Sequence, residues 1–328
     1  MPPPSLTTAF GLLWSSPELP LLELPLAEPG GMVQATVTVG REAPVSWPSL
    51  PAGPHDTPFV QMARDDLRLR VEGIARFRVS GGERIAFDPW QGEGNPGDLR
   101  TFLLGSAVGA LLIQRGMLLL HGNALEKDGR AIVSLGHSGA GKSTTAYALM
   151  QQGWRLLADD LVAITPEGLV LPGIPRIKLW HDAVRAFGLD PETLPPIRQG
   201  MGKYLLMGEG VRRAAEAVPL AALFLLHKRP ADGEDPEGAR ITRITSQKEA
   251  ALTLRNQAFR PRFVRGLGQE GPNFIALARL QKRVPLATLP LPSSIAAMRS
   301  WLEAQDLLTA AARAEGPRPC SPATPAPA

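Results

Sequence analysis

The chain has 328 residues, of which 44% are hydrophobic and 20% charged, and this composition indicates a globular rather than a disordered protein. The formal net charge is +4 without any dense run of Lys or Arg, so the sequence gives no reason to expect nucleic-acid binding. The single cysteine, Cys320, excludes an internal disulfide and fits a reducing cytoplasm.

The N-terminus and the apolar segments predict a cytoplasmic protein without a membrane span. The first residues lack an early Lys or Arg and a clean apolar core, so they do not resemble a signal peptide. The longest apolar stretch, Thr101–Ile113, is shorter than the roughly 20 residues that cross a bilayer, and we expect a buried helix there. The five histidines are scattered without metal-ligand spacing, so no zinc site is expected.

Residues 1–98 are predicted to form a small β-rich N-terminal domain, since they are rich in Pro and Gly and contain short alternating runs. Four arginines would lie on the polar faces of two neighbouring strands. They could form a docking surface for an acidic partner or simply a solvated sheet face, which is the commoner case. These arginines are Arg68, Arg70, Arg76 and Arg78, and the expected strands cover 33–39, 67–71, 74–79 and 83–89.

From Asp98 onward the pattern changes, and residues 99–313 are predicted to form a second, α/β domain. Residues 314–328 are rich in Pro and Ala and are predicted to be a disordered tail. In chain order we expect a helix over 98–116, three strands within 117–135, a glycine-rich loop, a helix that Gly153 closes, a strand over 154–165, and helices over 246–259 and 293–314.

The glycine-rich loop carries a nucleotide-binding motif. Its run GHSGAGKS matches the P-loop pattern G-x-x-x-x-G-K-[ST], and an apolar strand precedes it while a helix follows. Backbone N–H groups and the helix N-terminus would surround the phosphates, with Lys142 reaching the β- and γ-phosphates and Ser143 placed to ligate Mg²⁺. The predicted nucleotide-binding residues are Gly136, His137, Ser138, Gly139, Ala140, Gly141, Lys142, Ser143 and Thr144.

Three further residues are candidates for catalysis beside this loop. Asp159 and Asp160 end the strand that follows the loop helix, and in a parallel arrangement that strand end returns to the phosphates. One carboxylate could hold Mg²⁺ and the other could accept the proton of an attacking hydroxyl. His121 follows an apolar strand upstream and could orient an aspartate or assist proton transfer. We therefore predict His121, Lys142, Asp159 and Asp160 as catalytic residues, and Ser143 with one of the two carboxylates, Asp159 if Asp160 is the base, as metal ligands. The alternatives are ordinary solvated acids at a strand end and a structural histidine.

The run LLHGNALEKDGRAIVSLGHSGAGKSTTAYALMQQGWRLLADDLVAI resembles the catalytic domain of bacterial HPr kinase/phosphorylase. The order and spacing of His121, Lys142 and Asp160 match that family. The resemblance implies a P-loop kinase domain related to PEP carboxykinase, and transfer of a phosphoryl group from ATP to a seryl hydroxyl. By the family pattern, Asp160 would be the base, His121 and Lys142 its catalytic neighbours, and Ser143 a magnesium ligand.

The flanking sequences resemble the HPr kinase-related proteins, some of which accompany lasso-peptide gene clusters and phosphorylate a Ser of the precursor peptide. The runs that carry this likeness are LLGSAVGALLIQRG, PRIKLW and RNQAFRPRFV. The metal-binding Glu in the signature loop of HPr kinases has no counterpart in LPGIPRIKLWHDA. This departure counts against a reverse phosphorylase activity and against HPr as the substrate.

Three basic residues are candidate phosphate or substrate contacts, namely Arg176 and Lys178 in the strand-like IPRIKLW and Arg260 in RNQAFRPRFV. The alternative for each is an ordinary surface charge. The sequence as a whole predicts a kinase that uses ATP and Mg²⁺ and acts on a Ser of a peptide or protein. A kinase for a small-molecule hydroxyl and a nucleotide-binding regulatory module remain open, as does a homo-oligomer, and neither nucleic acid nor a membrane is an expected partner.

Overall fold

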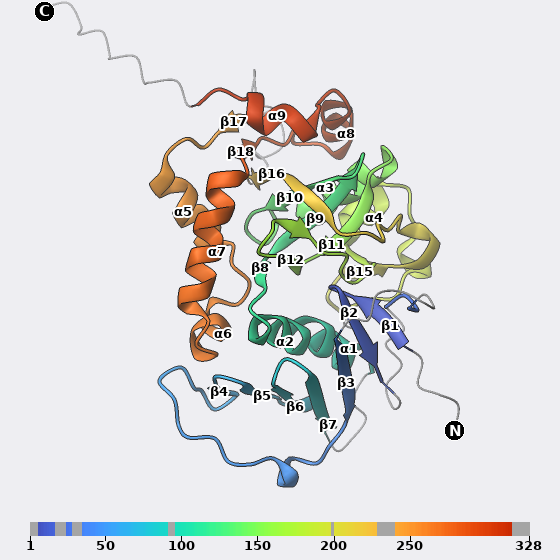
Figure 1. Cartoon of the computed structure of the whole chain (residues 1–328). Coiled ribbons are helices and arrows are strands. Elements are labelled where there is room, and N and C mark those ends of the chain that lie inside the picture. The colour runs from blue at the N-terminus through green and yellow to red at the C-terminus, as the bar shows by residue number, and fades with distance from the viewer. Residues whose placement is uncertain are drawn as a thin grey trace, which may run out of the picture.

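The computed structural model describes residues 6–16, 24–27, 35–90, 96–197, 200–227 and 240–316 (Figure 1). Within these residues the chain forms two large sheets, one small hairpin, and helices that lie between and around them. Figure 1 shows the sheet of the N-terminal strands at one end of the molecule, with the helices near α2 separating it from the second sheet. Cys320 and most of the predicted tail, residues 317–328, lie outside the described residues.

Within the described residues, seven strands form the N-terminal sheet. Four of them lie in the predicted alternating runs, and the other three, at Leu6–Ala9, Leu12–Ser15 and Val60–Ala63, were not predicted. Ala75, Phe77 and Val79 are buried on one face, and the arginines between them lie on the other. Of the first predicted strand, Val33 and Gln34 lie outside the described residues. In spatial order the strands are β1 (Leu6–Ala9), β2 (Leu12–Ser15), β3 (Thr36–Arg41), β7 (Arg84–Pro89), β6 (Ala75–Ser80), β5 (Asp66–Val71) and β4 (Val60–Ala63).

The row of arginines predicted on this sheet is compensated by acids of the same sheet. Arg68 lies directly opposite Arg78, and Asp66 is 3.6 Å from the first and 2.8 Å from the second. The second opposite pair, Arg70 and Arg76, makes ion pairs of 3.8 Å with Glu72 and Asp88 and lies over the Trp90 ring. These contacts favour a solvated sheet face over a docking surface for an acidic partner.

The predicted helix over 98–116 forms the layer next to this sheet. It is continuous through α1 (Pro96–Phe102), a π-helical turn (Leu103–Ala107) and α2 (Val108–Gln114). Its buried face joins the core of the N-terminal sheet, together with Phe259 and Phe263 from much later in the chain. The domain boundary after residue 98 stays a prediction. Residues on both sides of it belong to the same hydrophobic core.

The second sheet is mixed. β16 is its central strand and runs parallel to both β10 and β18, while β9 runs antiparallel to β10 and β11. Consequently β10 and β11 point in the same direction with β9 between them, and both end at the same edge. In spatial order the strands are β11 (Arg155–Asp159), β9 (Gly122–Lys127), β10 (Arg130–Leu135), β16 (Val218–Leu226), β13 (Leu169–Val170), β12 (Val162–Ile164) and β8 (Leu118–Leu120), with β18 (Leu286–Leu289) beside β16 and β17 (Thr242–Arg243) beside β18.

The prediction of one strand over 154–165 is wrong, because the chain turns at Asp160. This residue has a φ of 67°, a left-handed conformation that cannot continue a strand. β11 ends at Asp159, and β12 starts at Val162 and pairs with β8 in another part of the sheet. The turn places the Asp160 side chain beside the strand edge at which the glycine-rich loop begins.

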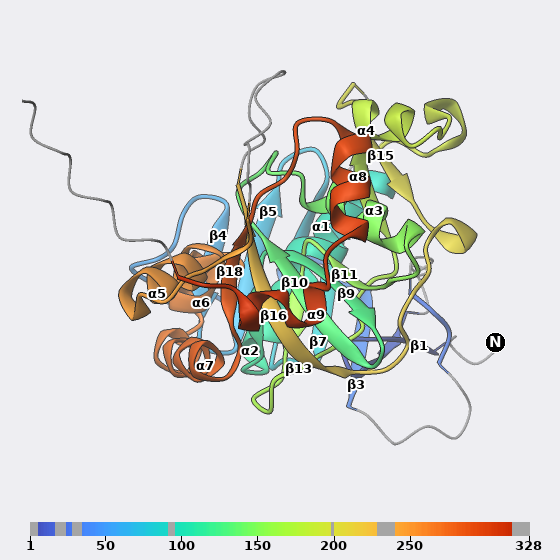
Figure 2. The same cartoon turned by 90° about the horizontal axis from the view of Figure 1, so that it is seen from above.

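Alternating side chains divide the second sheet between two cores. Ile132 packs on the face covered by α3 (Lys142–Gln151), α4 (His181–Ala186), α8 (Ile295–Glu303) and α9 (Leu307–Arg313), and Figure 2 shows α3 and α8 close together. Ala131 and Val133 pack on the opposite face, against α5 (Gln247–Asn256) and α7 (Glu270–Arg283). Such alternation requires helices on both faces.

The predicted helix over 293–314 is also divided, into α8 and α9. Helix α8 ends at Glu303, and Asp306 precedes α9, where its carboxylate accepts a hydrogen bond from the Thr309 hydroxyl. Aspartate at the start of a helix stabilises a new N-terminus rather than a helix interior. Of the helices in the described part of the chain, none is long and apolar enough to cross a membrane.

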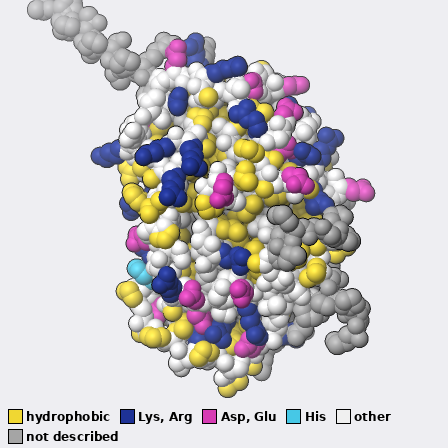
Figure 3. Space-filling view, viewed as in Figure 1, with side chains coloured by type: hydrophobic (Ala, Val, Ile, Leu, Met, Phe, Trp, Pro, Cys, Tyr) yellow, Lys and Arg dark blue, Asp and Glu magenta, His cyan; other side chains and the backbone are white. Residues whose placement is uncertain are grey.

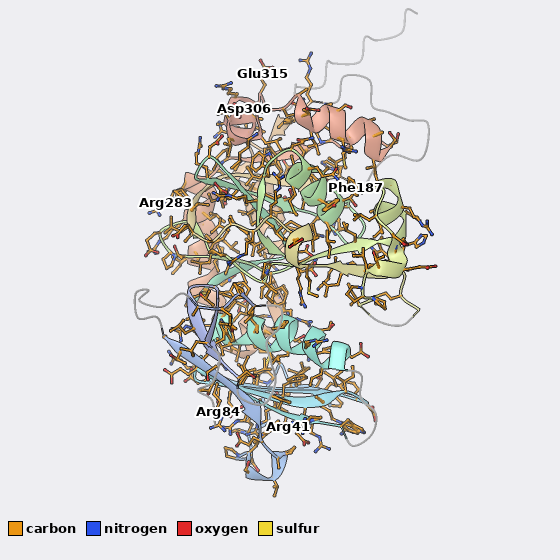
Figure 4. The ribbon with its side chains drawn as sticks, turned by 90° about the vertical axis from the view of Figure 1, so that its right-hand side faces the viewer. Arg41, Arg84, Phe187, Arg283, Asp306 and Glu315 are labelled. Carbon is orange, nitrogen blue, oxygen red and sulfur yellow. The ribbon has the colours of Figure 1, made fainter. Side chains whose placement is uncertain are left out.

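A hairpin of β14 (Ile177–Trp180) and β15 (Lys203–Leu206) packs against α3 and α4. Figure 4 shows the two ends of the molecule: Arg41 and Arg84 lie on the N-terminal sheet, and Asp306 and Glu315 lie at the opposite end. Lys and Arg side chains gather over α5 and α7 in Figure 3. The remaining short elements are α6 (Pro261–Gly266), η1 (Pro44–Ser46), η3 (Pro191–Thr193) and η4 (Gly208–Gly210).

Gly122 is required where β9 and β10 approach each other beside the glycine-rich loop. A Cβ at this position would lie 2.5 Å from the backbone oxygen of Ser134 and 3.1 Å from Leu135. We expect Gly122→Ala to lower the free energy of unfolding by about 1–3 kcal/mol, measured by urea denaturation. The matched control is Gly40→Ala in β3, where no atom lies within 4 Å of the added Cβ and the change should stay within about 0.5 kcal/mol. Equal losses in the two variants would contradict this explanation.

Candidate functional site

The loop between β10 and α3 depends on three glycines with positive φ. The φ values are 149° at Gly136, 82° at Gly139 and 93° at Gly141, where side-chain-bearing residues would be strained. At Gly136 there is also no room, because an added Cβ would meet the Leu226 backbone oxygen at 3.0 Å. The loop residues His137, Ser138 and Gly139 are exposed. Backbone N–H groups of the loop and of the first α3 turn are thus available to a ligand.

Lys142, the first residue of α3, folds its side chain back over this loop. Its Nζ donates hydrogen bonds to the backbone oxygens of Gly136 at 2.7 Å and His137 at 3.1 Å. The residue is 8% exposed, and burial lowers the pKa of its ammonium group, although the charges of Asp160 and Asp159 oppose that effect. A cation therefore lies at the rim of the loop, and its predicted contact with the β- and γ-phosphates stays a prediction.

Asp159 connects three elements around the start of α3. Its Oδ1 accepts hydrogen bonds from the Ser143 hydroxyl at 3.2 Å and from the buried Asn123 amide in β9. Its Oδ2 accepts the backbone N–H of Lys178 in β14 at 2.9 Å. Burial raises the pKa of Asp159, and the neighbouring negative charge of Asp160 adds to the increase.

Asp160 lies one residue further on and faces a different set of groups. Its carboxylate Oδ2 is 2.6 Å from Nζ of Lys178, and its backbone oxygen is 3.1 Å from Nδ1 of His121. Burial alone would raise the pKa of this carboxyl, but the charge and hydrogen bond of Lys178 outweigh burial and lower it. The Asp160 side chain is therefore ionised, and 29% of it stays exposed.

His121 stands between β8 and β9 and is neutral in this setting. Burial and the charge of Lys142 lower the pKa of its imidazole. A hydrogen bond to the Asp160 backbone oxygen requires a proton on Nδ1, which leaves Nε2 of the neutral ring as an acceptor. The backbone N–H of His121 donates to the Gln257 backbone oxygen at 2.7 Å.

Most of these groups line one open pocket of about 490 Å³. The predicted catalytic residues His121, Lys142 and Asp160 line it, whereas Asp159 lies behind them and contacts Ser143. Its walls also contain two residues that the sequence did not single out, Trp180 and Lys203. The full lining is His121, Ser138, Gly139, Gly141, Lys142, Ser143, Thr144, Asp160, Lys178, Trp180 and Lys203.

Two of the predicted phosphate or substrate contacts lie elsewhere. Arg176 is buried and lines a separate pocket of about 140 Å³, and burial lowers the pKa of its guanidinium to about 10. The Arg260 guanidinium donates to the Ser106 hydroxyl at 2.8 Å and lies over the Phe259 and Phe263 rings. Of the three basic candidates, Lys178 alone lines the larger pocket.

Other residues that support the pocket were missed by sequence reasoning. Asn123 is a fully buried polar residue at the start of β9, two positions after His121 in the sequence, and this position next to a candidate residue is a usable signal. Gln257 follows the last residue of α5, and its Oε1 accepts the Gly136 N–H at 3.1 Å from 121 residues away in the chain. No local pattern marks such a contact.

The oxygens near the start of α3 fit a magnesium ion. The Ser143 hydroxyl and the Asp159 carboxylate lie 3.2 Å apart, and hydroxyl and carboxylate oxygens are the hard ligands that Mg²⁺ prefers. The described residues contain no group of three or more His, Cys, Asp or Glu side chains that could hold a metal ion. A site with so few protein ligands suits Mg²⁺, which keeps several waters and binds substrate phosphates.

Replacement of Gln257 tests its support of the loop. Gln257→Leu would leave the buried N–H of Gly136 without its acceptor, and should lower the free energy of unfolding by about 1–3 kcal/mol in urea denaturation. Gln281→Leu is the matched control, because its side chain bonds the Gln247 backbone oxygen at an exposed position, and its effect should stay within about 0.5 kcal/mol. An unchanged stability of Gln257→Leu would show that water replaces this hydrogen bond.

Comparisons with known proteins give partial matches. HPr kinase/phosphorylases are 39% identical over 80 residues in Caldanaerobacter subterraneus, over 75 residues in Treponema pallidum and over 95 residues in Lactobacillus delbrueckii. These matches cover 24%, 22% and 28% of this chain and 26%, 24% and 30% of the three relatives. No protein-family profile matches the chain.

Among solved structures, that of the Hpr(Ser) kinase/phosphatase from Coxiella burnetii aligns with 56% of this chain and 91% of its own. The identity is 13% and the TM-score 0.27, which is too low for a comparison of the two folds. The chain spans about a quarter to a third of the length of the curated relatives that it matches. On these sequence matches, about a quarter of the chain is similar to HPr kinase/phosphorylases, in line with the resemblance that the sequence predicted.

Proposed function

We propose that the protein is an ATP- and Mg²⁺-dependent kinase that transfers the γ-phosphoryl group to a seryl hydroxyl of a peptide or protein, such as the precursor of a lasso peptide. The observation that carries this proposal is the position of the Asp160 carboxylate. It lines the same pocket as Lys142 and the glycine-rich loop, and it is held there by Lys178 at 2.6 Å. A carboxylate beside a phosphate-binding loop is the arrangement that proton acceptance from a hydroxyl requires.

In this proposal the loop and α3 bind the nucleotide. The loop N–H groups and the α3 N-terminus would surround the phosphates, and Lys142 would exchange its bonds to the loop carbonyls for phosphate oxygens. Ser143 and Asp159 would hold Mg²⁺, which supplies charge neutralisation at the phosphates. Binding and positioning would contribute most of the rate, as in other phosphoryl transfers.

The transfer itself uses Asp160 as the base. The seryl oxygen forms a bond to the γ-phosphorus while the bond from that phosphorus to the bridging oxygen breaks, and ADP leaves. The seryl proton passes to the Asp160 carboxylate, which Lys178 keeps ionised. His121 contacts the Asp160 backbone oxygen and so positions the residue from the other side.

The remaining parts of the proposal follow from the sequence. Residues 99–313 would form a kinase domain of the HPr kinase and PEP carboxykinase type, and residues 1–98 would orient the substrate. The protein would act in the cytoplasm. A kinase for a small-molecule hydroxyl would use the same residues. A regulatory module that binds nucleotide without transfer is the other alternative. The intact set of catalytic candidates, His121, Lys142, Asp159 and Asp160, counts against it.

Asp160→Asn tests the base directly. Asparagine has the same shape and tolerates the positive φ of this position, so the backbone should be retained. We expect transfer to fall by at least about 100-fold while nucleotide affinity changes little. The assay incubates ATP and Mg²⁺ with a Ser-containing peptide encoded beside the gene, and detects the added mass of about 80 Da of one phosphoryl group.

The matched control is Asp128→Asn, since Asp128 also has a positive φ, of 53°, but lies in the turn between β9 and β10. This variant should keep wild-type activity. Wild-type turnover in Asp160→Asn would disprove the base assignment. A wild-type protein that binds ATP but transfers phosphate to no hydroxyl acceptor would support the regulatory module instead.

A further inference from the structure

The hairpin β14–β15 presents a fixed face to the pocket. Lys178 and Trp180 alternate along β14, and Lys203 pairs directly with Trp180 across the hairpin, so all three lie on one face. All three line the pocket. The opposite face is anchored, because Ile177 and Leu179 are 0% and 1% exposed in the core. The hairpin therefore cannot turn these three side chains away without exposing two buried aliphatic residues.

The three lysines of the pocket differ in what they contact. Lys142 bonds two loop carbonyls, and Lys178 is paired with Asp160. Lys203 has its Nζ 5.4 Å from the centre of the Trp180 ring, and within the described ranges no carboxylate lies at ion-pair distance from it. A ring face attracts an ammonium group but accepts none of its strong hydrogen bonds. Lys203 thus presents hydrogen-bond donors to whatever occupies the pocket.

Trp180 holds this ammonium group in place. The indole is 49% exposed although it is a large hydrophobic side chain, and it forms part of the pocket wall. Its ring restricts the motion of the long Lys203 side chain, which otherwise loses rotamer entropy on binding a ligand. The pair is a preorganised cation on the hairpin side of the pocket, and it faces the space shared by the loop and Asp160.

We propose that Lys203 is a further catalytic residue, which contacts the terminal phosphoryl group of the nucleotide during its transfer, and that Trp180 is its positioning residue. This inference rests on the proposed kinase function. In that reaction the phosphoryl group must lie between the loop and Asp160, and Lys203 lines the same pocket as both. An ammonium group at this place stabilises the phosphoryl oxygens as the bond to the bridging oxygen breaks.

The test compares two nucleotides that differ in the terminal phosphate. Binding of Mg²⁺ with ADP, and of Mg²⁺ with a non-hydrolysable ATP analogue, is measured by isothermal titration calorimetry on the full chain. Lys203→Met should lower the affinity for the analogue about tenfold and change the affinity for ADP by less than about twofold. The difference corresponds to the loss of one charge-assisted hydrogen bond to the terminal phosphate. Lys203→Arg should restore most of the affinity. Trp180→Leu leaves Lys203 in place but removes the ring that positions it. This variant should therefore also lower the ratio of analogue affinity to ADP affinity.

Lys127→Met is the matched control, because Lys127 Nζ also lies over a tryptophan ring, 5.7 Å from the centre of Trp154, and does not line the pocket. It should change neither affinity. If Lys203→Met weakens both nucleotides equally, or neither, with an unchanged circular dichroism spectrum, the inference is overturned while the kinase proposal stands. If the wild-type protein binds neither nucleotide, the proposed function fails and this inference with it.

Discussion

The site depends on the three hydrogen bonds that the half-buried carboxylate of Asp159 accepts. They come from Ser143 at the start of α3, from Asn123 in β9 and from the backbone of Lys178 in β14. Removing a carboxylate from water is costly unless its oxygens accept hydrogen bonds, so these three bonds hold the three elements together. The loop helix, the sheet edge and the hairpin are thereby held at one spacing, and the neighbouring Asp160 is left to face the pocket.

The order of strands explains how residues far apart in the sequence reach this edge. Because β9 lies antiparallel between β10 and β11, the start of β9 and the ends of the other two strands meet there. His121 precedes β9, the glycine-rich loop follows β10, and Asp160 follows β11. Gly122 permits the close approach of β9 and β10 at this point. One antiparallel strand therefore brings together His121, Asp160 and the glycine-rich loop, which carry the proposed function.

The electrostatics of the pocket favour an anionic ligand. Three lysine side chains line it together with one ionised carboxylate, and one of them, Lys142, is buried enough to have a lowered pKa. Lys178 neutralises Asp160, so the charges of Lys142 and Lys203 remain for a ligand. Phosphate groups supply the negative charge and the acceptor oxygens that such a set requires. The same surroundings keep Asp160 ionised and His121 neutral.

The sequence by itself determined the P-loop motif, the strands and helices around it, the order of His121, Lys142 and Asp160, and a family resemblance that the sequence matches confirm. These depend on alternation, glycine spacing and motif order, which are local or linear properties of the chain. Only the tertiary structure decided that β9 separates β10 from β11, that a predicted strand breaks at Asp160, and that Arg260 turns away to Ser106. It likewise brought Lys203 and Trp180 to the pocket wall, because hairpin pairing and burial of the opposite face act between residues that no sequence pattern relates.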